Sequence, residues 1–225
     1  FASKKVSLSP GYHRFVVDAE LDDVVAWDPS DASTLYVMKA NLQLGEHSDV
    51  VEDRFGFRTL GHDGVRVTLD GSPRTLYGIS RHEDHAVSGP WQPAEHLAED
   101  LELLQDLGAN HIRPGHYPAD PRFLELIEDG SGLTVAEEIP VYQWDGPQMG
   151  DEVLAEQAER QLRAMIQRDR NNPSIVMWSL MNEVLSWDVD AGPFAERLAT
   201  VARGEDPGRL LTYSALAFPG AYFDD

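Results

Sequence analysis

Asn182 and Glu183 are the residues best placed to do chemistry, because they end an apolar run at residues 174–180 that follows an Asn-Pro pair. Such a run is typical of a strand buried on both faces of a parallel sheet, with Trp178 in the core. In α/β barrels the chemistry lies at the carboxyl ends of these strands. We therefore predict that Glu183 is a catalytic acid and that Asn182 hydrogen-bonds a substrate hydroxyl.

Polar clusters also occur where three other strands are expected to end, at residues 78–85, 113–118 and 137–144. The carboxyl ends of barrel strands meet on one face, so we expect the clusters to share one site with Asn182 and Glu183. Aromatic side chains beside polar groups suit the C–H faces of sugar rings. The candidate binding residues are His82, Arg113, His116, Glu138, Tyr142 and Trp144.

Each cluster also has a purely structural interpretation. The histidines could be polar residues of a barrel rim, and Arg113 could simply pair with Glu83 or Glu138, because a buried guanidinium group requires a carboxylate. Tyr142 and Trp144 could pack rather than face a ligand. The coincidence of four clusters at four strand ends favours the functional interpretation.

A metal-assisted hydrolase that uses His82, His85 and Glu83 is a different chemical hypothesis. The chain has no cysteine, and its histidine spacing matches no compact metal motif. We predict no metal and no cofactor.

The elements that would position the site alternate between strands and helices after Arg58. A hairpin over residues 65–77 precedes them. Strands are predicted to begin near Leu76, Asn110, Leu133, Ser174 and Leu210, and helices to span residues 93–107, 121–128, 151–168 and 193–203. This α/β pattern predicts the first five or so βα units of a (β/α)8 TIM barrel over residues 61–225.

Residues 1–60 have a different pattern of short strands, expected at residues 5–8, 12–17, 34–44 and 55–58. We interpret them as the C-terminal part of an immunoglobulin-like β-sandwich, joined to the barrel near residues 59–64. Roughly three further βα units would be needed to close the barrel. We therefore expect the chain to be an internal fragment of a larger protein.

The chain is strongly acidic, with a net charge of −21 from 39 acidic and 18 basic residues. This charge argues against nucleic acid and anionic membranes as partners. No apolar run is long enough for a membrane span, and we expect a soluble protein. The acidity is compatible with a halophilic source and with an ordinary acidic enzyme. The sequence is also compatible with a cytoplasmic or a secreted location, and with a homo-oligomer of the full-length protein.

Five ordered motifs resemble the successive signatures of glycoside hydrolase family 2, which includes β-galactosidases and β-glucuronidases. The motifs are Phe-Gly-Phe-Arg at 55–58, Gly-Ile-Ser-Arg-His-Glu-Asp at 78–84, Ile-Arg-Pro-Gly-His-Tyr-Pro at 112–118, Arg-Asp-Arg-Asn at 168–171 and Trp-Ser-Leu-Met-Asn-Glu at 178–183. The resemblance implies a sandwich followed by a catalytic barrel, which agrees with the strand pattern.

The resemblance also implies roles for individual residues. Glu183 would be the general acid/base of a retaining exo-β-glycosidase, and Asn182 would bond the sugar 2-hydroxyl. Arg113, His82 and His116 would line the subsite for the terminal sugar, with Arg113 holding the nucleophilic carboxylate.

The family places its nucleophile on the seventh strand, so we expect it beyond Asp225 and expect this chain alone to lack turnover. The alternative is a non-catalytic carbohydrate-binding or scaffold protein derived from such an enzyme.

Overall fold

A parallel sheet is the centre of the computed structural model, which describes residues 3–7 and 9–216. Within these residues five strands pair in the order β6-β7-β8-β9-β10, so each strand lies beside its predecessor in the chain. This order is the one expected of successive βα units, and the partial barrel is confirmed. The strands are β6 (Gly78–Arg81), β7 (His111–Pro114), β8 (Thr134–Glu138), β9 (Ile175–Val184) and β10 (Leu210–Ala215).

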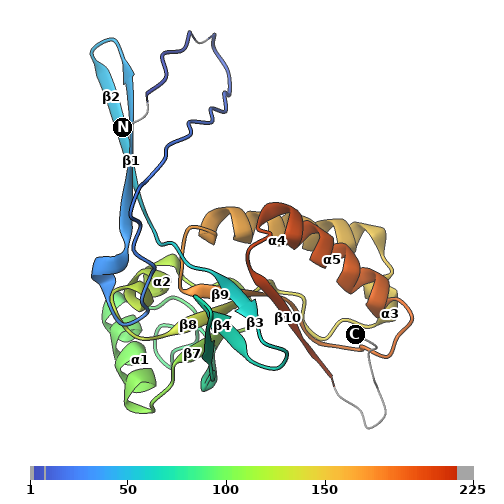
Figure 1. The fold of residues 1–225 in the computed structure, drawn as a ribbon. Helices are drawn as coiled ribbons and strands as arrows, with labels where there is room; N and C mark the ends of the chain where they lie inside the picture. Colours follow the sequence, from blue (N-terminus) through green and yellow to red (C-terminus); the bar gives the residue numbers. More distant parts are fainter. Residues whose placement is uncertain (1–2, 8, 217–225) are drawn as a thin grey trace.

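Helices connect and cover these strands (Figure 1). They are α1 (Ala94–Asp106), α2 (Pro121–Glu128), the short α3 (Gly146–Met149), α4 (Glu152–Asp169) and α5 (Ala191–Glu205). The apolar faces of α1, α2, α4 and α5 pack with the strand side chains into one core, and every residue of β8 is buried. Burial on both faces of the sheet explains why β9 has an apolar run rather than an alternating pattern.

Local signals set the helix boundaries close to the predicted positions. The carboxylate of Asp120 caps α2 by accepting a hydrogen bond from the Arg122 amide, and Asp151 caps α4 in the same way. Gly108 lies just beyond α1 with φ of 72°, a left-handed conformation that ends the helix at low cost. The short α3 was not predicted, because its four residues show no periodicity.

A small antiparallel sheet precedes the barrel strands and comprises β3 (Leu60–His62), β4 (Val67–Leu69) and β5 (Ser72–Arg74). Its strands contribute Leu60 and Leu69 to a small cavity that is also lined by the start of β8. The sheet thus lies at the amino ends of the barrel strands, opposite the predicted site. The hairpin expected over residues 65–77 is formed by β4 and β5, but its strands are joined by the two residues Asp70 and Gly71, which both have positive φ, rather than by a turn over residues 70–73.

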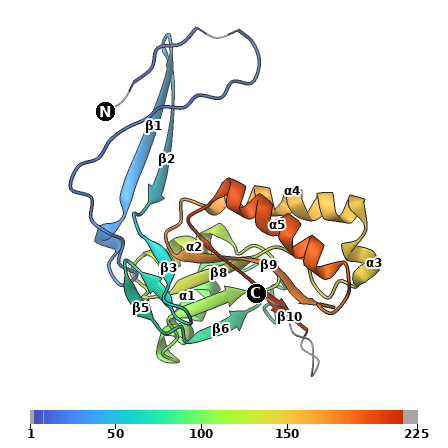
Figure 2. The ribbon, with the colours of Figure 1, turned by 45° about the vertical axis from the view of Figure 1, so that its right-hand side comes forward.

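A long hairpin projects from the barrel (Figures 1 and 2). It consists of β1 (Tyr36–Leu44) and β2 (His47–Phe55), preceded by the 3-10 helix η1 (Ala32–Thr34). This antiparallel pair fits the end of a sandwich. The polar start of β2 explains why only its last residue was predicted.

The strands predicted at residues 5–8 and 12–17 are not formed by the described residues, and Leu8 lies outside them. Tyr12 is 93% exposed and Val16 is 65% exposed, so their apolar side chains contact no core in the described structure. An alternating pattern produces a strand only where a neighbouring strand and a buried face exist.

The base of the hairpin is joined to the barrel by polar contacts. Arg54 forms an ion pair with Asp129 at 2.5 Å, and Arg58 donates to the carbonyl of Ile175 at 2.8 Å. The domain boundary near residues 59–64 remains a prediction. These residues include β3, which pairs with β4 on the barrel side.

Among the described residues no helix is long and apolar enough to cross a membrane.

Candidate active site

Asn182 and Glu183 lie near the carboxyl end of β9, as predicted. The amide nitrogen of Asn182 donates to the carbonyl of Val141 at 2.8 Å, and that of Gln143 donates to the carbonyl of Asn182 at 2.9 Å. Glu183 and Gln143 have φ of 49° and 56°, the left-handed region that side chains other than glycine rarely adopt. Backbone of this kind persists where surrounding contacts fix it, and it is frequent at functional sites.

The carboxylate of Glu183 is partly exposed and has one side-chain partner in the described structure. The Gln143 side-chain amide donates to Glu183 Oε2 at 2.8 Å. Gln143 was part of the polar cluster at residues 137–144 but was not among the predicted site residues. Its position in the loop that follows the buried strand β8 was the signal that could have identified it.

Glu138 is the buried centre of the site, with no exposed surface. It forms a short ion pair with Arg113 and accepts a short hydrogen bond from the Ser179 hydroxyl. Its second oxygen lies 2.7 Å from His116 Nδ1. Because a carboxylate only accepts, this contact requires the proton on Nδ1 and leaves Nε2 directed elsewhere.

Arg113 links Glu138 to Asn182. Its guanidinium donates to Asn182 Oδ1 at 2.8 Å, which fixes the orientation of that amide. The Asn182 Nδ2 atom is buried and has no hydrogen-bond partner among residues 3–7 and 9–216. A buried donor without an acceptor costs free energy, so a ligand oxygen there would be favourable. The predicted pairing of Arg113 with a carboxylate is formed with Glu138 rather than with Glu83.

Three rings lie in a row at this end of the sheet. His82 and His116 contact edge to face at 5.2 Å, and Tyr142 stacks on His116 at 5.1 Å with an interplanar angle of 5°. Tyr142 is 46% exposed and so presents aromatic surface to solvent. Trp144 instead packs against Phe194 of α5 at 5.5 Å, which is the packing arrangement considered for it above.

The structure therefore brings Asn182, Arg113, Glu138 and His116 into one connected cluster, with His82 and Tyr142 beside it. Ser179 was missed by sequence reasoning, which treated the whole of the strand before Asn182 as core. A lone hydroxyl inside an otherwise apolar strand was the available signal. Trp178 is fully buried, as predicted.

The strand before the first polar cluster was predicted too early in the chain. Residues 78–81 are β6 itself rather than the segment that follows it. The Arg81 guanidinium is directed to α1, where Nε donates to Asp100 at 2.9 Å, and it lies 4.1 Å over the ring of Phe123. Arg81 thus holds helices to the sheet.

The residues of the metal hypothesis have other partners. His85 lies against His96, with ring centroids 3.9 Å apart, and Glu83 contacts Arg81. Over residues 3–7 and 9–216, no group of three or more His, Cys, Asp or Glu side chains is arranged to hold a metal ion.

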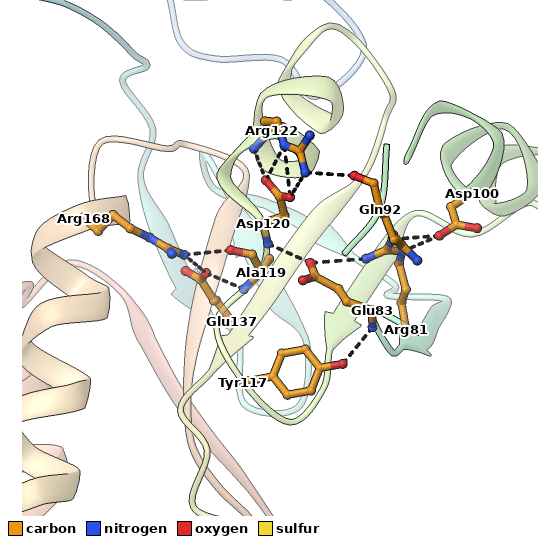
Figure 3. Close-up of polar contacts among 10 residues, drawn as sticks. All are labelled: Arg81, Glu83, Gln92, Asp100, Tyr117, Ala119, Asp120, Arg122, Glu137 and Arg168. Carbon is orange, nitrogen blue, oxygen red and sulfur yellow. Dashed lines mark hydrogen bonds and ion pairs between the residues drawn. The ribbon is translucent and has the colours of Figure 1, made fainter. Parts of the chain in front are cut away.

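A second buried acid, Glu137, lies beside Glu138 on the opposite face of β8. Burial raises the pKa of Glu137 well above its usual range, and the neighbouring Asp169 carboxylate raises it further. Arg168 of α4 lies 3.2 Å from Glu137 and acts against this shift. Adjacent acids in one strand thus have different contacts. Glu138 bonds the residues of the candidate site, whereas Glu137 bonds Arg168 of α4 and the amide of Ala119 (Figure 3).

The fold and this cluster together define a barrel with a carboxylate, amide and imidazole site at the carboxyl ends of its strands. Residues 63–224 match the family model described as the TIM barrel domain of the family 2 glycosyl hydrolases. The chain belongs to glycoside hydrolase family 2, as its motifs predicted.

Known relatives include a β-glucuronidase of Paenibacillus borealis, 31% identical over 86% of this chain, and a β-galactosidase of Thermoanaerobacterium thermosulfurigenes, 35% identical over 84%. The chain spans 34% and 25% of the lengths of these relatives.

Among solved structures, a family 2 β-galacturonidase from Eisenbergiella tayi bound to galacturonate has a TM-score of 0.81 and 30% identity, covering 87% of this chain and 35% of that one. A β-D-glucuronidase of Dictyoglomus thermophilum has a TM-score of 0.76 and 28% identity, covering 84% of this chain and 34% of that one.

Proposed function

We propose that the protein containing this chain is a retaining exo-β-glycosidase and that Glu183 is its general acid/base. The observation that carries the proposal is the Asn182-Glu183 pair at the end of β9, beside a cluster built on Glu138. Glu183 would protonate the glycosidic oxygen as the bond to the anomeric carbon breaks. It would then take a proton from the water that releases the sugar.

Asn182 is proposed to bond the 2-hydroxyl of the terminal sugar. Its Nδ2 atom is buried and has no partner within the described part of the chain, while Oδ1 accepts from Arg113. The amide can therefore donate to a sugar oxygen. A flip of the amide group is unfavourable, because Arg113 would then face the NH2 group instead of the Oδ1 acceptor. His82, His116 and the exposed ring of Tyr142 would complete this subsite.

A retaining mechanism needs a second carboxylate that attacks the anomeric carbon, about 5 Å from the first. Glu138 is a poor candidate, because it has no exposed surface and is already bonded to Arg113, His116 and Ser179. We propose that Glu138 holds Arg113 and His116 in place. We propose that the attacking carboxylate lies on the seventh strand of the complete barrel, beyond Asp225, so residues 1–225 alone should show no turnover.

The substrate is proposed to be a terminal β-linked sugar, either a uronic acid or a neutral hexose. Relatives named as β-glucuronidases, a β-galacturonidase and β-galactosidases support both. Assay of the complete gene product on p-nitrophenyl β-D-glucuronide, β-D-galacturonide and β-D-galactoside separates them. Binding of these sugars without hydrolysis would instead favour the carbohydrate-binding alternative.

The role of Glu183 is tested by Glu183→Gln in the complete gene product. Loss of proton donation should lower kcat/KM for an alkyl glycoside by about 100-fold or more. Formation of the glycosyl-enzyme from a 2,4-dinitrophenyl glycoside should be much less affected, because that leaving group needs no proton. The matched control is Glu196→Gln on the exposed surface of α5. Full activity of the Glu183 variant on the alkyl glycoside would refute the assignment.

A further inference from the structure

Two loops at the carboxyl edge of the sheet carry the histidines of the candidate subsite. His82 follows β6 directly, and His116 follows β7, and the two rings contact each other at 5.2 Å. Loops are more mobile than strands, so their relative position must be fixed by specific contacts if both rings are to meet one sugar. Glu83, next to His82 in the chain, makes those contacts.

Glu83 bonds the second loop through both its backbone and its side chain (Figure 3). Its amide nitrogen donates to the Tyr117 hydroxyl at 2.8 Å, and its Oε1 accepts from the Asp120 amide at 2.7 Å. The Glu83 side chain is only 15% exposed. The segment from 116 to 120 is thus held at two points, one on each side of Pro118, by a single residue of the neighbouring loop.

Both ends of this connection are attached to the rigid part of the fold. On one side Arg81, 3.4 Å from Glu83, is bonded to Asp100 of α1 and to Gln92. On the other side Asp120 caps α2, as described above. The preceding residue, Ala119, donates to Glu137 of β8 at 3.2 Å and accepts from Arg168 of α4 at 2.8 Å.

We propose that Glu83 is a positioning residue that sets the separation and orientation of His82 and His116. This proposal rests on the proposed glycosidase function of the site. Glu83 itself does not need to touch the substrate: its bonds are spent on Tyr117, Asp120 and Arg81. The Arg-His-Glu motif at residues 81–83 then combines three tasks, with Arg81 anchoring the helices, His82 facing the subsite and Glu83 tying the loops.

The kinetic test uses the complete gene product and the aryl glycoside that it hydrolyses best. Glu83→Ala removes the acceptor of the Asp120 amide and should lower kcat/KM by about 10- to 100-fold, with a raised KM, because the sugar subsite is misplaced. Glu83→Gln keeps Oε1 as an acceptor and should retain most of kcat/KM. Tyr117→Phe deletes the other contact, and its effect should be less than additive with that of Glu83→Ala.

Glu125→Ala, on the exposed surface of α2, is the matched control and should leave KM unchanged. If Glu83→Ala has the KM of the wild type, or if Glu83→Gln is as impaired as Glu83→Ala, the positioning role is wrong.

Hydrogen exchange separates this inference from the proposed function. In the same variants, amides at residues 82–93 and 115–120 should exchange faster in Glu83→Ala and Tyr117→Phe than in the wild type, while those of β8 and β9 stay protected. Unchanged exchange in both loops would overturn the inference even if the protein is a glycosidase. If the wild type hydrolyses no glycoside, the proposed function fails, and the exchange rates still decide whether Glu83 ties the loops.

Discussion

At the scale of single residues, the geometry of the candidate site is built around the buried Glu138 rather than the partly exposed Glu183. Glu138 receives contacts from Arg113, His116 and Ser179, and Arg113 in turn orients Asn182. A buried carboxylate is stable only when such donors surround it, so each donor contributes to folding as well as to geometry.

Ser179→Ala tests this dependence. Removal of a hydroxyl that donates to a buried carboxylate should lower the free energy of unfolding by about 2 kcal/mol, because Glu138 Oε2 keeps only its Arg113 donor and water cannot replace the hydroxyl. Urea unfolding followed by tryptophan fluorescence measures the change. Thr200→Ala is the control, since its hydroxyl bonds a backbone carbonyl on the exposed face of α5. Equal stability of the two variants would show that the Ser179 contact contributes nothing.

Glu128, at the end of α2, should make the free energy of unfolding fall as pH rises from 4 to 8. Burial raises the pKa of Glu128 to about 7, and the Ser174 hydroxyl donates to it at 3.0 Å. In the unfolded chain a glutamate has a pKa of about 4.3, so the folded state binds this proton more tightly. The resulting stabilisation is complete below pH 4.3 and is lost as pH rises toward 7.

Glu128→Gln removes this titration while keeping an oxygen for Ser174. The difference in unfolding free energy between variant and wild type should shift in favour of the variant by up to about 3 kcal/mol between pH 4 and pH 8. Denaturant titrations at several pH values measure that difference, and contributions from other groups cancel. A difference that is constant with pH would contradict the raised pKa.

At the scale of elements, two glycines near helix ends differ in backbone conformation, so their substitution by alanine should have opposite effects on stability. Gly108 has φ of 72°, and Gly192, within α5, has no positive φ. At both positions no atom of the described residues lies within 4 Å of an added Cβ. Gly108→Ala should destabilise the protein by about 1–2 kcal/mol through backbone strain alone. Gly192→Ala should be neutral or stabilising by up to about 1 kcal/mol. Thermal unfolding of the pair decides, and a Gly108 variant as stable as the wild type would exclude the strain.

Elements with a strong apolar period and local caps could be predicted from sequence, and those that need a distant partner could not. Helix α2 begins at Pro121 and ends at Glu128 as expected, because proline at the first turn and Asp120 as cap fix its start locally. The strand expected at residues 12–17 depended on a neighbouring strand that the described chain does not supply.

The site shows the same division between local and long-range information. That Glu183 and Glu138 lie together at strand ends follows from the barrel pattern. That Gln143 contacts Glu183, or that Glu83 contacts Asp120, depends on loop conformations with positive φ and on side-chain directions that no periodicity encodes.

At the scale of the whole molecule, net charge should make stability depend on salt. The chain has 39 acidic and 18 basic residues, so at pH 7 repulsion between carboxylates exceeds the attraction within ion pairs. Salt weakens both, since the screening length falls from about 30 Å at 0.01 M to about 3 Å at 1 M. Because the repulsive pairs are more numerous and mostly farther apart, their loss dominates, and Tm should rise between 0.01 M and 1 M NaCl at pH 7.

The control for this effect is pH rather than a second salt. At pH 5 the protein binds more protons than at pH 7, so its net negative charge is smaller. The increase of Tm with NaCl should therefore be smaller at pH 5 than at pH 7. An equal increase at both pH values would point to a general salting-out effect on apolar surface. A Tm that falls with NaCl at pH 7 would mean that specific ion pairs, such as those of Arg197 with Glu152 and Glu159 between α4 and α5, outweigh the excess negative charge.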